Sequence, residues 1–369
     1  MQNILGFLVL THSSRRTDLT LCSRDSLAHR YSAADRLRKV PDFTTLPPIS
    51  EFECYSGGLT IYKLGRRRNT GITVKDLGYL KTKKKIQHAI ILEPDRILIV
   101  YESSVELWKL KESLNTLRRL NNECFMVEKK YENRLFAGLH TAARVSENLV
   151  VLSASAPDAI LLLDIVTGHV KKMLRMPKEY YGSNYDITRE MDLREHYIYN
   201  DLQVAHINCA YAVNKNEILV SALIPGCIGR FNLATEAYSE LVTGYIGCHG
   251  VRVTDTGDIY FSDSTGGELI FIDSNGEVVR KFSLMSRWLH DSIHIIDDIY
   301  AISVADRNEL RLIDLCSGDI LFNKKYHGND NPSKQVNKIA DFLSQIFPGM
   351  YRGSSTQFLS FYKIAEAVG

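Results

Sequence analysis

One unit recurs along this chain: a histidine followed by a short strand, a polar turn and two further strands. Its clearest copy spans residues 248–273, where His249 precedes strand-like runs at Val251 to Thr254, Ile259 to Asp263 and Leu269 to Ile272. Apolar and β-branched residues alternate in these runs, and clusters of Gly, Asp and Ser separate them. This pattern predicts an antiparallel meander.

Four other segments repeat the same order, and they begin at His88, His140, His206 and His290. Together with His249, these histidines follow one another at intervals of 52, 66, 43 and 41 residues. A unit of three to four strands at a spacing of about 40–50 residues is typical of a β-propeller blade. Because a single blade leaves one face unburied, we expect the units to stack around a common axis.

The two ends of the sequence complement each other. The runs Ile4 to Leu10 and Asp18 to Cys22 match the second and third strands of a unit that lacks its first strand, and Gln357 to Ile364 supplies a spare strand. Propellers commonly close their ring by joining such strands in one blade, which leaves no free sheet edge. The sequence therefore predicts an all-β fold, a single propeller domain over residues 1–369, with six blades, or seven if residues 52–85 form their own.

Three segments depart from the strand pattern. Residues 26–51 are irregular and charged, and they include two consecutive prolines. Residues 171–202 lengthen the third interval and are rich in Tyr, Arg, Glu and Met, which makes them a candidate lid. Residues 331–347 have helical periodicity and stop at Pro348 and Gly349. We expect all three to be insertions at the surface of the propeller.

Composition excludes several classes of function. The net charge is +2, which is too small to predict a nucleic-acid partner. No run approaches the ~18 apolar residues of a membrane helix, and Ile4 to Leu10 lacks the basic region of a signal peptide. The seven cysteines form an odd set with no CxxC pair, which argues against a disulfide framework. We therefore predict a cytoplasmic protein, without predicting its oligomeric state.

The unit at 248–273 resembles an NHL-type repeat. The residues that carry the resemblance are His249-Gly250-Val251, the turn Thr256-Gly257-Asp258, the strand 259–264 and the strand 269–273 followed by Asn275-Gly276. Six-bladed propellers of this type include sugar lactonases, peptidyl-hydroxyglycine lyases and binding modules. The lyases set histidines from separate blades around an axial metal. The resemblance thus implies a fold and allows a metal centre, but it names no single activity.

The histidines themselves are the candidate metal ligands. The first strand of each propeller blade lines the central channel, so residues at the same offset in successive units lie at the same height near the axis. Neutral imidazoles suit iron, zinc and copper, and three or four protein ligands with open positions are typical of a catalytic metal. We predict a transition metal, Fe(II) first and Zn(II) or Cu second, held by some or all of His88, His140, His206, His249 and His290. Two alternatives remain open: histidines that cap the blade entrances, and an anion or substrate bound without metal.

Four further residues are candidates for the catalytic chemistry. Asp291 follows His290 directly and could be a metal ligand, an acceptor that orients an imidazole, or a general base. Arg144 and Arg252 follow their histidines and would suit a carboxylate or phosphate group by bidentate pairing. Arginines at such positions also commonly pair with an acid of the neighbouring blade. Tyr211 is a fourth channel-side candidate.

Two functions follow from these residues. The first is a metal-dependent enzyme that acts on a small, possibly anionic, organic substrate. With iron it would be an oxygenase or other oxidoreductase, since the site resembles the four-histidine constellation of carotenoid-cleaving oxygenases; with zinc it would be a lyase or hydrolase. The alternative is a non-catalytic propeller that binds a protein or peptide and has structural histidines. The sequence has no P-loop, GxGxxG, GxSxG or HExxH motif, so nucleotide-dependent and serine-hydrolase chemistry are not expected.

Overall fold

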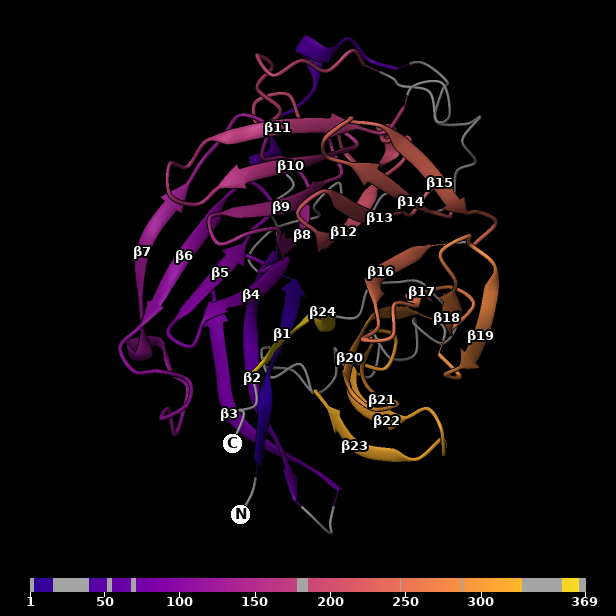
Figure 1. Ribbon diagram of the computed structural model, residues 1–369. Helices are drawn as coiled ribbons and strands as arrows, with labels where there is room; N and C mark the ends of the chain where they lie inside the picture. The colour runs from indigo at the N-terminus through magenta and orange to yellow at the C-terminus, as the bar shows by residue number, and fades with distance from the viewer. Residues whose placement is uncertain are drawn as a thin grey trace, which may run out of the picture.

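The protein is an all-β propeller with six blades. The computed structural model describes residues 3–15, 40–51, 55–67, 71–177, 185–245, 247–286, 288–326 and 354–364. Six four-stranded sheets, each built from antiparallel neighbours, radiate from a central axis (Figure 1). The six-bladed alternative of the sequence prediction is therefore confirmed, and residues 55–82 form part of a shared blade and not a seventh one.

The strands are numbered along the chain, and each blade is written from its innermost strand outward. Blade 1 consists of β24 (Ser354–Lys363), β1 (Asn3–Arg15), β2 (Tyr55–Arg67) and β3 (Gly71–Thr82). Blade 2 consists of β4 (His88–Glu93), β5 (Arg96–Val100), β6 (Val105–Leu110) and β7 (Phe125–Tyr131). Blade 3 consists of β8 (Leu139–Arg144), β9 (Leu149–Ala154), β10 (Ala159–Asp164) and β11 (Val170–Arg175).

The second half of the ring follows the same plan. Blade 4 consists of β12 (Ile207–Asn214), β13 (Glu217–Ala222), β14 (Cys227–Asn232) and β15 (Tyr238–Val242). Blade 5 consists of β16 (Cys248–Val253), β17 (Ile259–Asp263), β18 (Glu268–Ile272) and β19 (Val278–Ser283). Blade 6 consists of β20 (Leu289–Ile296), β21 (Ile299–Val304), β22 (Glu309–Asp314) and β23 (Ile320–Lys325).

The innermost strands form a closed ring. Each of β24, β4, β8, β12, β16 and β20 contacts the next, and β20 returns to β24. In blade 1, β24 pairs with β1 in register from Gly6 opposite Lys363 to Ser14 opposite Ser354, with one irregularity. This blade therefore combines strands from two distant parts of the sequence, and β1 is covered on both edges.

The hydrophobic core lies between neighbouring blades. Most second and third strands are buried on both faces because each sheet is packed between two others; β10, with the sequence AILLLD, is an example. The seam between blades 1 and 2 illustrates the packing: Phe7 and Ile61 of blade 1 meet Ala89 and Ile99 of blade 2. Burial of such side chains stabilises the fold by about 1.5–3 kcal/mol each.

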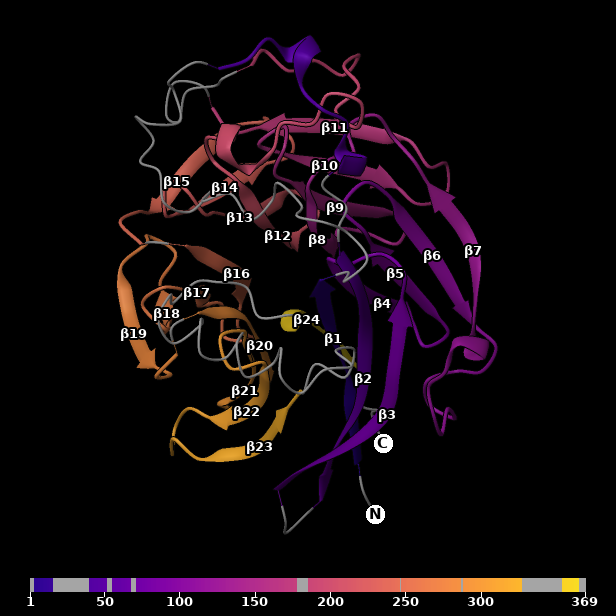
Figure 2. The same cartoon turned by 180° about the vertical axis from the view of Figure 1, so that it is seen from behind.

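Two insertions pack together beside blade 3, as both views show (Figures 1 and 2). The first contains the short helical turns η2 (Phe43–Thr45) and η3 (Ile49–Glu51), and the second ends with η5 (Asn200–Leu202). The backbone N–H of Ile49 donates to Arg194 O at 2.7 Å, and Tyr197 N–H donates to Pro47 O at 2.9 Å. The two segments thus cover the apolar seam between blades 2 and 3.

Three segments of the sequence prediction need correction or lie outside the described residues. Residues 171–175 are not part of the insertion, because they belong to the outer strand β11. The third strand of the shared blade was predicted at Asp18 to Cys22, but β2 (Tyr55–Arg67) takes that place. The segment Asp18 to Cys22 and the predicted helix at 331–347 lie outside the described residues. A further short turn, η4 (Asn122–Cys124), precedes β7. In the part of the chain that the structure describes, no helix is long and apolar enough to cross a membrane.

Candidate functional site at the channel mouth

All five predicted histidines lie where an innermost strand begins. His88 starts β4, His140, His249 and His290 are the second residues of β8, β16 and β20, and His206 directly precedes β12. We call the side of the propeller on which these strands begin the histidine face. The turns between the second and third strands of each blade lie on the same face, because neighbouring strands are antiparallel.

Four of the histidines make two ring-to-ring contacts. The ring centroids of His140 and His206 are 5.0 Å apart, and those of His249 and His290 are 4.8 Å apart. Across the described ranges, no three His, Cys, Asp or Glu side chains are grouped so that they could hold a metal ion. The expected ring of three to five metal ligands is therefore not found among the described residues, and the Fe(II), Zn(II) or Cu centre stays a prediction.

His88 is not available as a ligand, which corrects its predicted role. Its Nδ1 accepts a hydrogen bond from the backbone N–H of Ala142 at 3.1 Å, and its Nε2 lies 3.1 Å from Leu359 O and donates to it in the matching tautomer. Burial lowers the pKa of His88 to about 4, so the ring is neutral at pH 7. The imidazole instead links three innermost strands: β4, β8 and β24.

His206 is positioned by the turn that follows β9. Its φ is +51°, a left-handed conformation that a non-glycine residue adopts only when its surroundings impose it. Asp158 imposes it here, because its carboxylate accepts from the N–H of His206 at 2.6 Å and from that of Val204 at 3.0 Å. Burial raises the pKa of Asp158 to about 6, and these N–H groups oppose the rise. The Nδ1 of His206 lies 2.5 Å from Gln203 Oε1, which fixes the ring.

His249 and His290 form the second pair. The Nδ1 of His249 lies 2.8 Å from Gly247 O and 2.7 Å from Ser264 Oγ, and the ring meets Trp288 edge to face. Burial lowers the pKa of His290 well below its usual value, and the neighbouring charges of His249 and Lys85 lower it further. The positive charge of Lys85 reaches this mouth of the channel, which disfavours a bound cation and favours an anion.

Arg252 and Asp291, both predicted to be catalytic, form a buried ion pair inside the channel. The guanidinium donates to Asp291 Oδ1 at 2.5 Å and to Oδ2 at 3.0 Å, as well as to Leu359 O at 3.0 Å. Asp291 also accepts from the N–H of Leu359 at 2.8 Å. Burial would lower the pKa of Arg252, but the charge of Asp291 outweighs burial and raises it. The pairing of an arginine with an acid of the next blade, the alternative left open above, is the one observed.

Gly250 makes room for this ion pair. Its φ is +57°, and a Cβ at this position would lie 2.1 Å from Asp291 Oδ1. The glycine in the His-Gly sequence of blade 5 is thus required by the close approach of a neighbouring carboxylate. We call Arg252, Asp291, Leu359 and His88 the axial network, because they join the innermost strands of blades 5, 6, 1 and 2 and, through Ala142, blade 3.

The two other predicted catalytic residues are not brought to the histidines. Arg144 is the last residue of β8, at the opposite end from His140, and donates to Leu92 O at 2.9 Å and Ser146 O at 3.2 Å. Tyr211 packs beside Cys209 and Val251 within the blade 4 and blade 5 seam, and burial raises its pKa. Cys209 and Cys248 are buried thiols of that seam.

Two contributors were missed because their role depends on contacts between distant segments. Gln203 orients His206 from an insertion, and Leu359 joins the axial network only through its main-chain atoms. The pattern of side chains in a sequence does not show which main-chain oxygen accepts a hydrogen bond from a distant residue. For Gln203, the sequence shows only that it lies in the insertion directly before His206.

Comparison with known proteins adds a fold likeness only. No protein-family model matches the chain, and no curated protein is similar enough in sequence to count as a relative. Among solved structures, 1206 chains resemble it. One is the WD40 β-propeller domain of Doa1, with a TM-score of 0.44 and 11% sequence identity over 66% of this chain and 69% of that one. The finer resemblance to NHL-type repeats stays a prediction.

Proposed function

We propose that this protein is a non-catalytic binding propeller, and that a protein or peptide partner docks on its histidine face. The observation that carries the proposal is Met285, which is 81% exposed in the connection between β19 and β20. Its φ is +51°, so the backbone is held in a conformation that only surrounding contacts sustain. Met285 is the most exposed large apolar side chain among the described residues, and covering it with a partner would gain hydrophobic free energy.

Contacts on both sides of Met285 hold it in place. Its carbonyl accepts from Arg307 at 2.6 Å, Leu284 N–H donates to Gly267 O at 2.9 Å, and Ser286 Oγ donates to Asp306 Oδ1 at 2.8 Å. Trp288, partly exposed, lies three residues further on against His249. Methionine, tryptophan and arginine are enriched at the centres of protein interfaces, and methionine adapts to varied partners.

The polar groups in the channel support binding over catalysis. The strongest candidates for acid–base and anion chemistry, Arg252 and Asp291, satisfy each other and the main chain of β24. His88 uses both ring nitrogens in the same way. Groups whose hydrogen bonds are all made within the protein stabilise the scaffold, whereas a catalytic acid or base needs a lone pair or a proton that faces the substrate.

A peptide-display selection tests this function. Random linear peptides displayed on phage would be selected on the untagged full chain, and their affinities compared between the wild type and Met285→Asp. We expect about tenfold weaker binding, because a charge replaces the apolar contact. The matched control is Met126→Asp on the outer strand β7, where the methionine is 56% exposed, and its binding should be unchanged.

Three outcomes would overturn the proposal. The selection yields no binding peptide; the selected peptides bind Met285→Asp as well as the wild type; or the untagged protein contains near-stoichiometric transition metal that His249→Ala removes without unfolding the chain. The last result would restore the metal-dependent enzyme that the histidine spacing predicts.

A further inference from the structure

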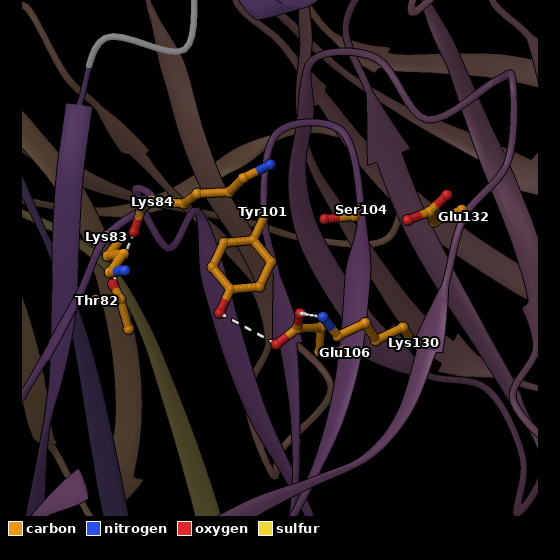
Figure 3. Close-up of a pocket in the computed structure, with 8 residues that line it drawn as sticks. All are labelled: Thr82, Lys83, Lys84, Tyr101, Ser104, Glu106, Lys130 and Glu132. Atoms are coloured by element: carbon orange, nitrogen blue, oxygen red, sulfur yellow. Dashed lines mark hydrogen bonds and ion pairs between the residues drawn. The ribbon is translucent and has the colours of Figure 1, made fainter.

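A second feature of the histidine face is a cavity of about 300 Å³ between blades 1 and 2 (Figure 3). Three neighbouring segments form it: the connection from β3 to β4, the turn between β5 and β6, and the end of β7. We call it the basic pocket. It is lined by Thr82, Lys83, Lys84, Tyr101, Ser104, Glu106, Lys130 and Glu132.

The acidic residues of the basic pocket already have partners. Glu106 accepts from Trp108 Nε1 at 2.7 Å and from the Tyr101 hydroxyl at 3.4 Å, and it lies 3.6 Å from Lys130 Nζ. Glu132 lies 3.9 Å from Arg194. Within the described part of the chain, Lys83 forms no ion pair. Three lysines and two glutamates line the pocket, so the formal charge of its lining is positive.

The lysine-bearing segment is held in a fixed position. The Thr82 hydroxyl donates to Lys84 O at 2.7 Å, and Figure 3 shows the Lys84 side chain extending towards Tyr101. Beyond it, the backbone of Lys85 crosses β2 so closely that a Cβ on Gly57 would lie 2.9 Å from Lys85 Cα. The charge of Lys85 acts on His290. Positive charge thus extends from the basic pocket towards the channel mouth.

A buried amide lies on the same seam. Gln87 is fully buried, and neither its side-chain oxygen nor its nitrogen has a hydrogen-bond partner among the described residues. The corresponding positions before His140 and His290 are Leu139 and Leu289, both buried. By strand alternation Gln87 faces the same way as Ala89, which packs in the seam that contains Tyr101.

We propose that the basic pocket binds a carboxylate-rich extended segment of the docking partner. This inference rests on the proposed function and names the chemistry of the partner. The carboxylates of the segment would pair with Lys83, Lys84 and Lys130, and Tyr101 provides a flat wall for its main chain. Glu106 and Glu132 at the rim oppose the dense charge of a nucleic acid.

Fluorescence anisotropy with a labelled oligo-glutamate peptide tests the pocket directly. We expect the wild-type chain to bind this peptide in preference to oligo-lysine, and more weakly as salt increases. Lys83→Glu combined with Lys84→Glu should weaken binding by about tenfold or more, since two attractions become repulsions. Lys215→Glu is the charge-matched control, because Lys215 lies in the exposed turn after β12, at the opposite face. It should leave binding unchanged.

Gln87→Leu is a control for the seam between blades 1 and 2. Leucine occurs at the same position in blades 3 and 6, so we expect this variant to remain folded with an unchanged or higher melting temperature. It should bind oligo-glutamate as tightly as the wild type, because Gln87 is buried and does not line the pocket. Equal affinity in the lysine double variant and the wild type would overturn the inference, as would binding of a single-stranded oligonucleotide with the same lysine dependence.

The two proposals fail in distinguishable ways. Selected peptides that need Met285 but carry no acidic residues, together with absent oligo-glutamate binding, would overturn the pocket assignment and keep the binding function. Oligo-glutamate binding that depends on Lys83, with no peptide that needs Met285, would support the pocket and overturn the Met285 docking site.

Discussion

The axial network and the basic pocket use similar side chains to opposite effect. In the axial network, Arg252 faces Asp291 and the main chain of β24, so every charge is matched inside the protein. In the basic pocket, three lysines and two glutamates line the cavity, and Lys83 forms no ion pair among the described residues. The comparison distinguishes two kinds of charged side chain. A charge that pairs within the fold is structural, whereas a net charge left over within the fold is available to a ligand.

Breaking the ion pair should have the largest effect on this comparison. Asp291→Asn leaves the buried guanidinium of Arg252 without its counter-charge, and we expect a loss of about 3–5 kcal/mol in the free energy of unfolding. Chemical denaturation measures it. If the variant does not fold, the double change Arg252→Met with Asp291→Leu should recover part of the stability, since the uncompensated charge is then gone. A loss below 1 kcal/mol would contradict a structural role for the pair.

Acid should weaken the axial network through His88. Its pKa of about 4 lies below the unfolded value of 6.5, so the unfolded chain binds more protons between these values. The stabilisation is therefore present above pH 6.5 and is lost as the pH falls towards 4, by about 3 kcal/mol in total. His88→Gln should remove this share of the pH dependence, and His169→Gln, at an exposed site, should not. Identical unfolding profiles for wild type and His88→Gln would refute the assignment.

Crowding the ion pair should have an intermediate effect. Gly250→Ala places a Cβ against Asp291 Oδ1 and in a left-handed conformation, and we expect a loss of about 1–3 kcal/mol. Gly257→Ala is the control, because its φ is +97° but no atom lies within 4 Å of the added Cβ. Thermal unfolding compares the two. Equal losses would mean that backbone strain alone acts at Gly250.

The smallest effect is expected in the basic pocket. Lys83→Glu should change the free energy of unfolding by less than about 0.5 kcal/mol, because the lysine is exposed and unpaired within the described residues. Denaturant titration of Lys83→Glu and Asp291→Asn under the same conditions measures both changes in the free energy of unfolding. A loss comparable with that of the axial network would show that the pocket lysines are structural, and the contrast between the two regions would disappear.

The blade pattern was predictable because inner and middle strands carry the core. The predicted bounds Ile259 to Asp263 coincide with β17, and the predicted run Leu269 to Ile272 lies within β18. The outermost strands of blades 2 to 6 were not identified, since one face of each is in water and their sequences are charged; β23, with the sequence ILFNKK, is mostly exposed. The insertion was predicted to start at residue 171, which lies inside β11, because this outermost strand also has a charged sequence.

The candidate site was only partly predictable. The spacing of the histidines placed all five at the start of innermost strands, because register follows from the repeat. What each imidazole contacts depends on neighbouring strands far away in sequence, as the bond from His88 to Leu359 shows. The spacing of the histidines in the sequence could not show which imidazole rings contact each other, or that Arg252 forms an ion pair with Asp291.

The pairing of β24 with β1 sets an order of events during synthesis. The strands of blades 2 to 6 are contiguous in sequence, so each of these blades can form soon after it leaves the ribosome. Blade 1 cannot, because its innermost strand is translated after all the others. Until then β1 presents an open edge able to pair with another chain. Completion of the ring is a late, long-range step, and the axial network can form only with it.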